Sequence, residues 1–232
     1  MRIQSNSALT LKSRSFTSES ATASSDFNTS CLTLVQKNPD NQDSSALASF
    51  FNEICPLSEE AISSIHEQTQ TVSLKKGQSL TTLATKDDNL FFILKGVVRG
   101  YIKYQGKDIT MWINADHEIV GSIPNLGILL PTDQHLQALE DCILIRIPQK
   151  LIEYLYEHFS EANLIGRALL EDHSRRMRDR AYIRRISSAE EKLMRFNEIL
   201  PELTDRIPRK YIASYLGIKQ ETIAHLRSPI KK

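Results

Sequence analysis

The chain has few cysteines and no long apolar run. These absences argue against a disulfide-rich protein, a membrane protein and a metal-binding protein. Its three cysteines, Cys31, Cys55 and Cys142, form no CxxC pair or other ligand spacing. A sparse, odd number is typical of a reducing compartment, and an iron–sulfur cluster takes about four thiolates. No apolar segment is long enough to cross a bilayer. The histidines form neither an HxH nor an HExxH pair. We therefore expect a cytoplasmic protein with no membrane contact, no metal and no cofactor.

Charge is nearly balanced over the whole chain but unevenly distributed along it. The 232 residues carry a formal net charge of +1. From His173 onward, fifteen Lys and Arg stand against seven Asp and Glu, a net of +8, which leaves fourteen against twenty-one, a net of −7, for the rest. A basic C-terminal segment on an acidic body favours a polyanionic partner, because neutralised phosphates release counterions. A solvated, salt-bridged helical face is the alternative interpretation.

The composition divides the chain into four parts. Residues 1–45 are rich in Ser, Thr and Asn and poor in large apolar residues, so we expect a disordered leader. Residues 46–160 are expected to form a β-rich domain with flanking helices, and residues 161–186 a single long helix. Residues 187–232 are expected to form a small helical domain.

Between residues 70 and 148, short apolar segments alternate with glycines and polar turn pairs. Short strands at close, regular spacing predict an antiparallel β-roll of the jelly-roll kind. The expected strands are 71–74, 89–94, 97–104, 108–114, 136–139 and 142–147. Helices are expected at 46–54, from Ser58, at 149–159, and from a capping box at Ser187 or Ser188 to Pro201. The expected fold class is therefore α+β.

Residues 209–227 predict two short helices joined by a tight turn. Ile212 and Leu216 share one face of the first helix, and Ile223 and Leu226 share one face of the second, which we expect to be buried. Gly217 lies between them, where the chain needs a residue that tolerates a positive φ. This is the spacing of a helix-turn-helix, whose second helix enters the DNA major groove. An αα-hairpin within another helical domain is the alternative.

A roll, a long helix and a basic helix-turn-helix, in this order, resemble the Crp/Fnr family of bacterial transcription regulators over residues 46–232. The resemblance is carried by residues 75–80, 90–101, 106–113, 137–142 and 207–217. It implies a cyclic-nucleotide-binding-like sensory roll that controls binding to double-stranded DNA, a homodimer held along the long helix, and RNA polymerase as a further partner. The predicted dimer contacts are Leu169, Leu170, His173 and Met177.

The second helix of the pair would begin near Lys219 and expose Gln220, Glu221 and His225. These side chains can pair with the base edges of adenine, cytosine and guanine, respectively. The predicted contacts to the DNA backbone are Thr222, Arg209, Lys210, Lys219 and Arg227. Lys219 stands where the family has a Ser or Thr cap, a departure expected to cost about 1 kcal/mol. No residues after Pro229 are available for a wing strand, so we expect weaker sequence-specific binding.

The roll lacks the groups with which family members hold a cyclic nucleotide, an arginine on the phosphate and a glutamate on the ribose. The chain has no arginine between Arg99 and Arg146, and Ser122 stands where the resemblance places the glutamate. We predict that the roll does not bind cAMP in the usual way, and Asp133 would repel a phosphate. The predicted pocket for an unidentified small-molecule effector consists of Gly121, Ser122, Asp133 and Gln134.

Two other functions stay open. The first is a ligand-binding signalling module whose helix-turn-helix does not bind DNA. The second is a jelly-roll metalloenzyme of the cupin type, which needs a compact His/Glu ligand set. His117 and Glu118 with the distant His135 lack that spacing. We expect no catalytic residues and no enzymatic activity.

Overall fold

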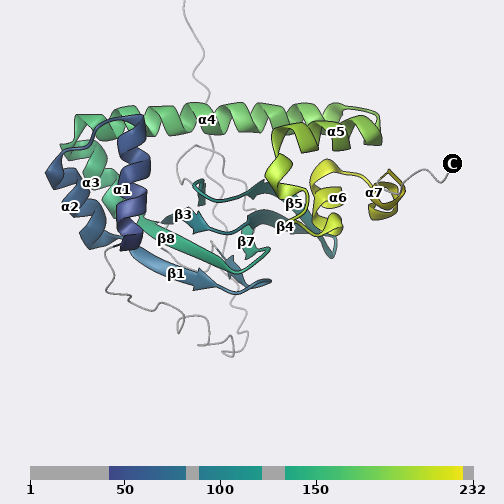
Figure 1. Ribbon diagram of the computed structural model, residues 1–232, viewed down its shortest axis with the longest axis horizontal. Coiled ribbons are helices and arrows are strands. Elements are labelled where there is room, and N and C mark those ends of the chain that lie inside the picture. The colour runs from purple at the N-terminus through teal and green to yellow at the C-terminus, as the bar shows by residue number, and fades with distance from the viewer. Residues whose placement is uncertain (1–41, 82–88, 122–133, 227–232) are drawn as a thin grey trace, which may run out of the picture. The chain divides into compact units, whose positions relative to one another are not determined.

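The computed structural model describes residues 42–81, 89–121 and 134–226 (Figure 1). Two helices precede the strands: α1 (Gln42–Ile54) and α2 (Glu59–Gln68). The strands are β1 (Gln70–Leu74), β2 (Ser79–Thr81), β3 (Asn89–Lys95), β4 (Val98–Tyr104), β5 (Lys107–Asn114), β6 (Ile119–Gly121), β7 (Gln134–Ala138) and β8 (Cys142–Pro148). The helices that follow are α3 (Gln149–His158), α4 (Ser160–Arg185), α5 (Ala189–Ile199), the 3₁₀ helix η2 (Pro201–Leu203), α6 (Arg209–Leu216) and α7 (Gln220–Leu226).

The strands form two antiparallel four-stranded sheets, in the orders β1-β8-β3-β6 and β2-β7-β4-β5. Alternate residues of both sheets face each other, because side chains along a strand point to opposite faces. They form the roll interior, an apolar cluster to which Val72, Phe91, Val98, Leu136 and Leu144 belong. The predicted α+β fold with an antiparallel β-roll is confirmed.

The outer face of the β1-β8-β3-β6 sheet is covered by helices. Phe92 and Ile145 on this face pack with Leu47 of α1, Leu151 of α3 and Ile165 of α4 in one cluster. Figure 1 shows α1, α2 and α3 together beside these strands, with α4 extending from them toward α5. No helix in the described ranges is both long and apolar enough to cross a membrane.

The C-terminal helices share a core with the roll. Four roll residues, Val97, Ile113, Ala115 and Leu139, pack in one buried cluster with residues of α4 to α7. The members from the C-terminal part are Ile183, Leu193, Phe196, Leu203, Ile212, Ala213, Tyr215, Leu216 and Ile223 of the helices, and Ile207 of the segment before α6. We call this cluster the shared core. Through it, the α6–α7 pair packs against the outer side of β5 and is not connected to the roll by the chain alone.

The element bounds differ from the predicted ones in a few places. Helix α1 begins at Gln42, four residues before the predicted start of order, while most of the 1–45 leader lies outside the described residues. Helix α4 covers 160–185, one residue earlier than predicted. Ser188 is the N-cap of α5 and its hydroxyl accepts from the Glu191 amide at 3.3 Å, as the capping box predicts.

Replacing Gly100 with alanine should lower the free energy of unfolding by about 2 kcal/mol, because a Cβ there overlaps the Trp112 ring inside the roll. Trp112 is the only tryptophan, so its fluorescence reports the displacement along with a lower Tm. Gly166→Ala is the matched control. The three atoms nearest its Cβ belong to the ring end of Tyr156, a side chain that is 45% exposed and can give way more easily than the Trp112 ring. Equal Tm values for the two variants would contradict a close approach at Gly100.

Candidate nucleic-acid interface

The α6–α7 pair turns at Gly217, which has φ +66° and ψ +39° in the left-handed region. The amide of Ile218 donates to the Ala213 carbonyl at 3.0 Å, and the amide of Gly217 donates to the Ser214 carbonyl at 3.4 Å. These two bonds satisfy the last carbonyls of α6 and fix the direction in which α7 begins. The glycine therefore has the positive φ that the sequence predicted.

Helix α7 is held by a single buried residue. Ile223 is 0% exposed and lies in the shared core against α5 and α6. The prediction that Leu226 is buried beside it was wrong, because Leu226 is 37% exposed. It lies three residues further on, at the last described residue, and is not a member of the shared core. Ile223 alone thus sets the rotation of α7.

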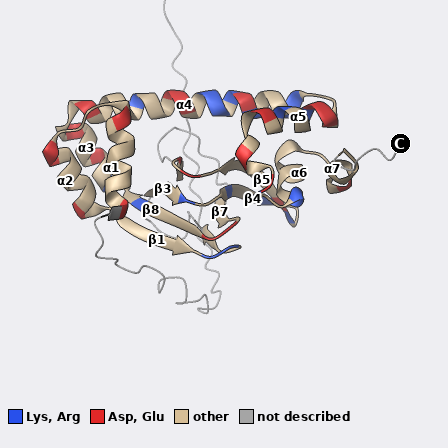
Figure 2. Ribbon diagram, in the orientation of Figure 1, with Lys and Arg blue, Asp and Glu red and all other residues tan. Residues whose placement is uncertain are grey.

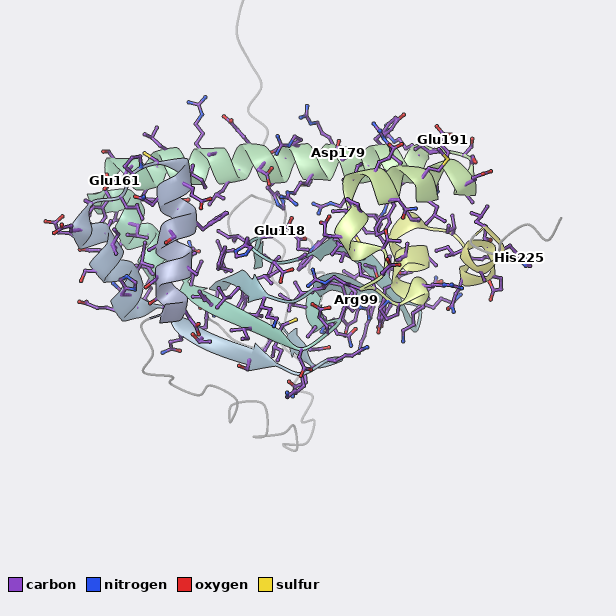
Figure 3. The ribbon with its side chains drawn as sticks, in the orientation of Figure 1. Arg99, Glu118, Glu161, Asp179, Glu191 and His225 are labelled. Atoms are coloured by element: carbon purple, nitrogen blue, oxygen red, sulfur yellow. The ribbon has the colours of Figure 1, made fainter. Side chains whose placement is uncertain are left out.

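This rotation exposes the three residues predicted to read bases. Gln220, Glu221 and His225 are all exposed, and Figure 3 shows His225 on α7, away from the strands. Glu221 and His225 are one turn apart and lie on the same face of the helix. Thr222 is half-buried, next to Ile223. The outer face of α7 therefore presents an amide, a carboxylate and an imidazole to solvent.

Basic side chains lie at the starts of both helices. Arg209 and Lys210 are exposed in the first turn of α6, and Lys219 is exposed immediately before α7. The Lys210 ammonium lies 4.7 Å from the centroid of the Tyr211 ring. The Lys219 carbonyl accepts from the Thr222 amide at 3.1 Å, so the backbone of Lys219 occupies the capping position. Arg227, the remaining predicted backbone contact, lies outside the described residues.

Helix α4 presents the residues predicted for a dimer contact on two different faces. Leu170 and Met177 are 45% and 52% exposed, and His173 is exposed between them. Leu169 packs against the cluster beneath α1 and α3 of its own chain. Figure 2 shows Lys and Arg interspersed with Asp and Glu along α4. Asp172, for example, pairs with both Arg175 and Arg176.

The predicted effector pocket is only partly described. Gly121 ends β6 at φ +137°, and a Cβ there would lie 2.8 Å from the Asn89 carbonyl oxygen. Gln134 begins β7. Ser122 and Asp133 lie outside the described residues, as does the side chain of Gln134.

The three residues weighed for a cupin-type site have separate surroundings. The His117 ring lies against Phe92, with centroids 6.0 Å apart, and the His135 ring stacks on Tyr101 at 5.0 Å. Glu118, which Figure 3 places beneath α4, pairs with Arg176 and accepts from the Ala115 amide at 3.0 Å. No group of three potential metal ligands occurs within the described residues.

Sequence reasoning missed a buried cation that joins the roll to α6. Arg99 of β4 is 2% exposed, and its guanidinium carbon lies 4.2 Å from the ring centroids of both Tyr101 and Tyr211. It donates to the Asp108 carboxylate at 2.9 Å, Gln137 at 2.8 Å and Thr110 at 3.1 Å. Figure 3 shows Arg99 close to α6. One signal was available, since Arg99 is a charged residue inside an otherwise apolar strand segment.

Strand β5 is an edge strand, and the helices satisfy the outward backbone groups of Thr110 near its middle. The Thr110 amide donates to the Ser214 hydroxyl at 2.9 Å, and the Thr110 carbonyl accepts from Arg184 at 2.8 Å. Arg184 also donates to the Tyr215 carbonyl at 3.3 Å. Covering an edge in this way removes unpaired backbone groups that would otherwise attract another strand. The docking of α6 on the roll is therefore polar as well as apolar.

A second arginine ties the segment before α6 to the roll. Arg206 donates to Asp116 at 2.7 Å and to Glu140 at 2.5 Å, and these bonds raise its pKa above the ordinary arginine value, Glu140 contributing most. Burial by itself would raise the pKa of Asp116. Hydrogen bonds from Arg206 and from the Gly96 amide outweigh burial and hold that pKa below its usual range.

We expect the Asp116–Arg206 contact to weaken in acid. Because folding lowers the pKa of Asp116, its contribution is complete above the unfolded value of about 3.9 and is lost as the pH falls through the folded value. At neutral pH, Asp116→Asn should lower the free energy of unfolding by about 0.5–1 kcal/mol, since both partners are about a third exposed. Urea unfolding from pH 7 to pH 3 should show this difference shrinking, whereas a constant difference would contradict the linkage.

Comparisons with known proteins agree with this architecture. Residues 71–159 match the family model described as the cyclic nucleotide-binding domain. Comparison with curated protein sequences finds no match. The fold is similar to a protein from Eubacterium rectale described as a transcriptional regulator of the Crp/Fnr family (18% identity, TM-score 0.60, 77% of this chain and 85% of that one).

Two further solved structures are similar over most of their length. FixK2 from Bradyrhizobium japonicum is 16% identical, with 68% of this chain and 82% of that one covered at a TM-score of 0.56. The c-di-GMP-responsive global regulator CLP of Xanthomonas campestris is 15% identical, with 73% and 89% covered at a TM-score of 0.56. At such identities the likeness is one of fold. Residues 71–159 therefore match the cyclic nucleotide-binding domain model, and the chain shares its fold with these solved regulators.

Proposed function

We propose that this chain is a sequence-specific DNA-binding transcription regulator in which α6 and α7 form a helix-turn-helix. The observation that carries the proposal is the face of α7. Gln220, Glu221 and His225 are exposed together, on a helix whose rotation is fixed by the buried Ile223. A carboxylate facing DNA is repelled by phosphates unless it accepts from a base, so Glu221 on this face supports base reading.

Each exposed side chain of α7 has a defined chemistry toward a base edge. The Gln220 amide can bond to adenine on both of its major-groove positions, Glu221 accepts from the amino group of cytosine, and His225 donates to guanine. The backbone contacts proposed are Thr222, Arg209, Lys210, Lys219 and Arg227. They supply affinity and register without reading sequence. The net charge of +8 from His173 onward supports this division of roles.

We propose further that two chains associate along α4. Leu170 and Met177 are seven residues apart and exposed, and His173 lies between them. A homodimer would present two copies of α7 and would therefore bind a site with two-fold symmetry. Leu169 faces its own chain instead, where it packs against the cluster that holds α4 on the roll.

The roll would act on DNA binding through the contacts that hold α6. Arg99, Thr110 and Asp116 of the roll each bond or stack with the segment from Arg184 to Ser214. A change in the roll that moves β4 or β5 would therefore be transmitted to α6 and α7. The effector that causes such a change is a small molecule other than a conventionally bound cAMP.

Binding to a randomised DNA library at near-physiological salt, followed by sequencing, tests the proposal. We expect enrichment of a two-fold symmetric site, at which the chain binds as a dimer. The control is Ile223→Asp, which places an unpaired carboxylate in the shared core and should release α7. In the contradicting outcome, the wild type and Ile223→Asp recover equal amounts of DNA, no sequence is enriched, and salt does not change the recovery. This result would favour the alternative, a ligand-binding signalling module whose α6–α7 pair does not bind DNA.

A further inference from the structure

Arg146 is a cation on the inner face of the roll. Along β8, Cys142 and Leu144 belong to the roll interior, and side chains two residues apart share a face of a strand. Arg146 therefore points to the same side. Its neighbour in register on β3 is Phe91, which also belongs to the roll interior. The half-buried Arg146 side chain thus shares its face of the sheet with residues of the roll interior, not with those that pack against the helices.

The guanidinium of Arg146 has an unsatisfied donor. Its Nε is buried and has no hydrogen-bond partner. Within the described part of the chain, no salt bridge involves Arg146. The other buried arginine behaves differently, because Arg99 donates to three side chains and stacks between two rings. The fold therefore gives each guanidinium nitrogen of Arg99 an acceptor and leaves the buried Nε of Arg146 without one.

The neighbours of Arg146 indicate what kind of group could accept a hydrogen bond from its guanidinium. Across the sheet it lies in one row with Gln70 of β1, Phe91 of β3 and Val120 of β6. This row holds a neutral amide and two apolar side chains, so it contains one positive charge and no negative one. A buried donor without an acceptor is unfavourable, and a guanidinium fork matches the geometry of two oxygens on one planar or tetrahedral centre.

We propose that the roll binds a small oxyanion, the carboxylate or phosphate group of a small molecule, on the guanidinium of Arg146. The ligand accepts from the donor that the protein leaves unpaired, while Phe91 and Val120 offer an apolar surface to the rest of the molecule. This site uses an arginine of the last strand of the roll. It concerns the roll alone and stands whether or not α7 reads DNA.

Titration of the full chain with inorganic phosphate, and separately with sodium acetate, tests the proposal at constant ionic strength. The first readout is the Nε–Hε NMR resonance of Arg146, assigned by its absence from Arg146→Lys. We expect one or both anions to shift it saturably. The two probes distinguish a phosphate site from a carboxylate site. This readout uses the wild-type protein and does not depend on the folding of a variant.

The second readout is thermal stability. At ten times its dissociation constant, the bound anion should raise the Tm of the wild type by about 3–6 °C. Arg146→Met should lose this response, and without anion its Tm should equal or exceed that of the wild type, because no unpaired donor remains. Arg178→Met, which removes an exposed arginine of α4, should keep the full response.

Three results would overturn the proposal. The first is an Arg146 resonance that neither anion moves. The second is an equal gain in Tm for the wild type and both methionine variants, which would assign the effect to general surface binding. The third is a Tm of the wild type that neither probe raises.

Discussion

Replacing Arg99 with alanine should lower the free energy of unfolding by about 3–4 kcal/mol, the largest loss of stability we expect from a single charged residue. The guanidinium is buried between Tyr101 of the roll and Tyr211 of α6, and Asp108, Gln137 and Thr110 accept from it. Its removal leaves the buried Thr110 hydroxyl without its donor and opens a gap between two rings, while the 44% exposed Asp108 is left to water. Urea unfolding followed by circular dichroism measures the loss.

Two further variants locate the source of that loss. Arg167→Ala breaks an exposed pair with Glu171 on α4 and should cost less than about 0.5 kcal/mol. A double-mutant cycle of Arg99→Ala with Tyr211→Leu should give a coupling energy of about 1 kcal/mol, because the ring contact exists only while both side chains are present. If Arg99→Ala costs no more than Arg167→Ala, the arginine does not hold α6 on the roll.

Replacing Glu221 with alanine should reduce discrimination at one base pair of each half-site by about tenfold to a hundredfold. Glu221 is exposed on the outer face of α7. In the proposed interface its carboxylate would accept from cytosine but repel phosphates. The variant should therefore bind unrelated DNA more tightly than the wild type while it loses preference for its own site. Competition binding with single-base variants of the selected site measures both effects.

Lys210→Ala provides the contrasting case for a backbone contact. It should weaken binding to all sequences alike and reduce the dependence of log K on log salt by about one unit. Glu202→Ala removes an exposed carboxylate of η2 and should change neither quantity. Unchanged discrimination in Glu221→Ala would show that this carboxylate does not face a base.

Most of the fold could be predicted, because its elements leave strong local patterns. The six predicted strands exist, and so does the turn at Gly217 with a positive φ. The strands β2 and β6 were missed, because three residues are too few to show an alternating pattern. Leu226 was misplaced for a different reason. A spacing of three from Ile223 places it near the same face but cannot say where the neighbouring core ends.

The contacts that join the roll to the helices could not be predicted from the sequence. Tyr211 lies more than one hundred positions after Arg99, and Ser214 is equally far from Thr110. Neither pair has a local spacing that would relate its members. The unpaired Nε of Arg146 could not be predicted either, because its surroundings come from three strands that are adjacent only in the folded sheet. The exposed residues of α7 were predictable, because the periodicity of a single helix determines which of its side chains face outward.

The shared core has a consequence for exchanging parts between regulators. Val97 and Leu139 of the roll are buried in one cluster with residues of α5, α6 and their neighbours. A fragment that stops after α4 would present these side chains and the open edge of β5 to solvent, and we expect it to aggregate. A chimaera that grafts foreign recognition helices onto this roll would need to carry the matching apolar surface with them. In this chain the α6–α7 pair can be exchanged only together with the roll surface that packs against it.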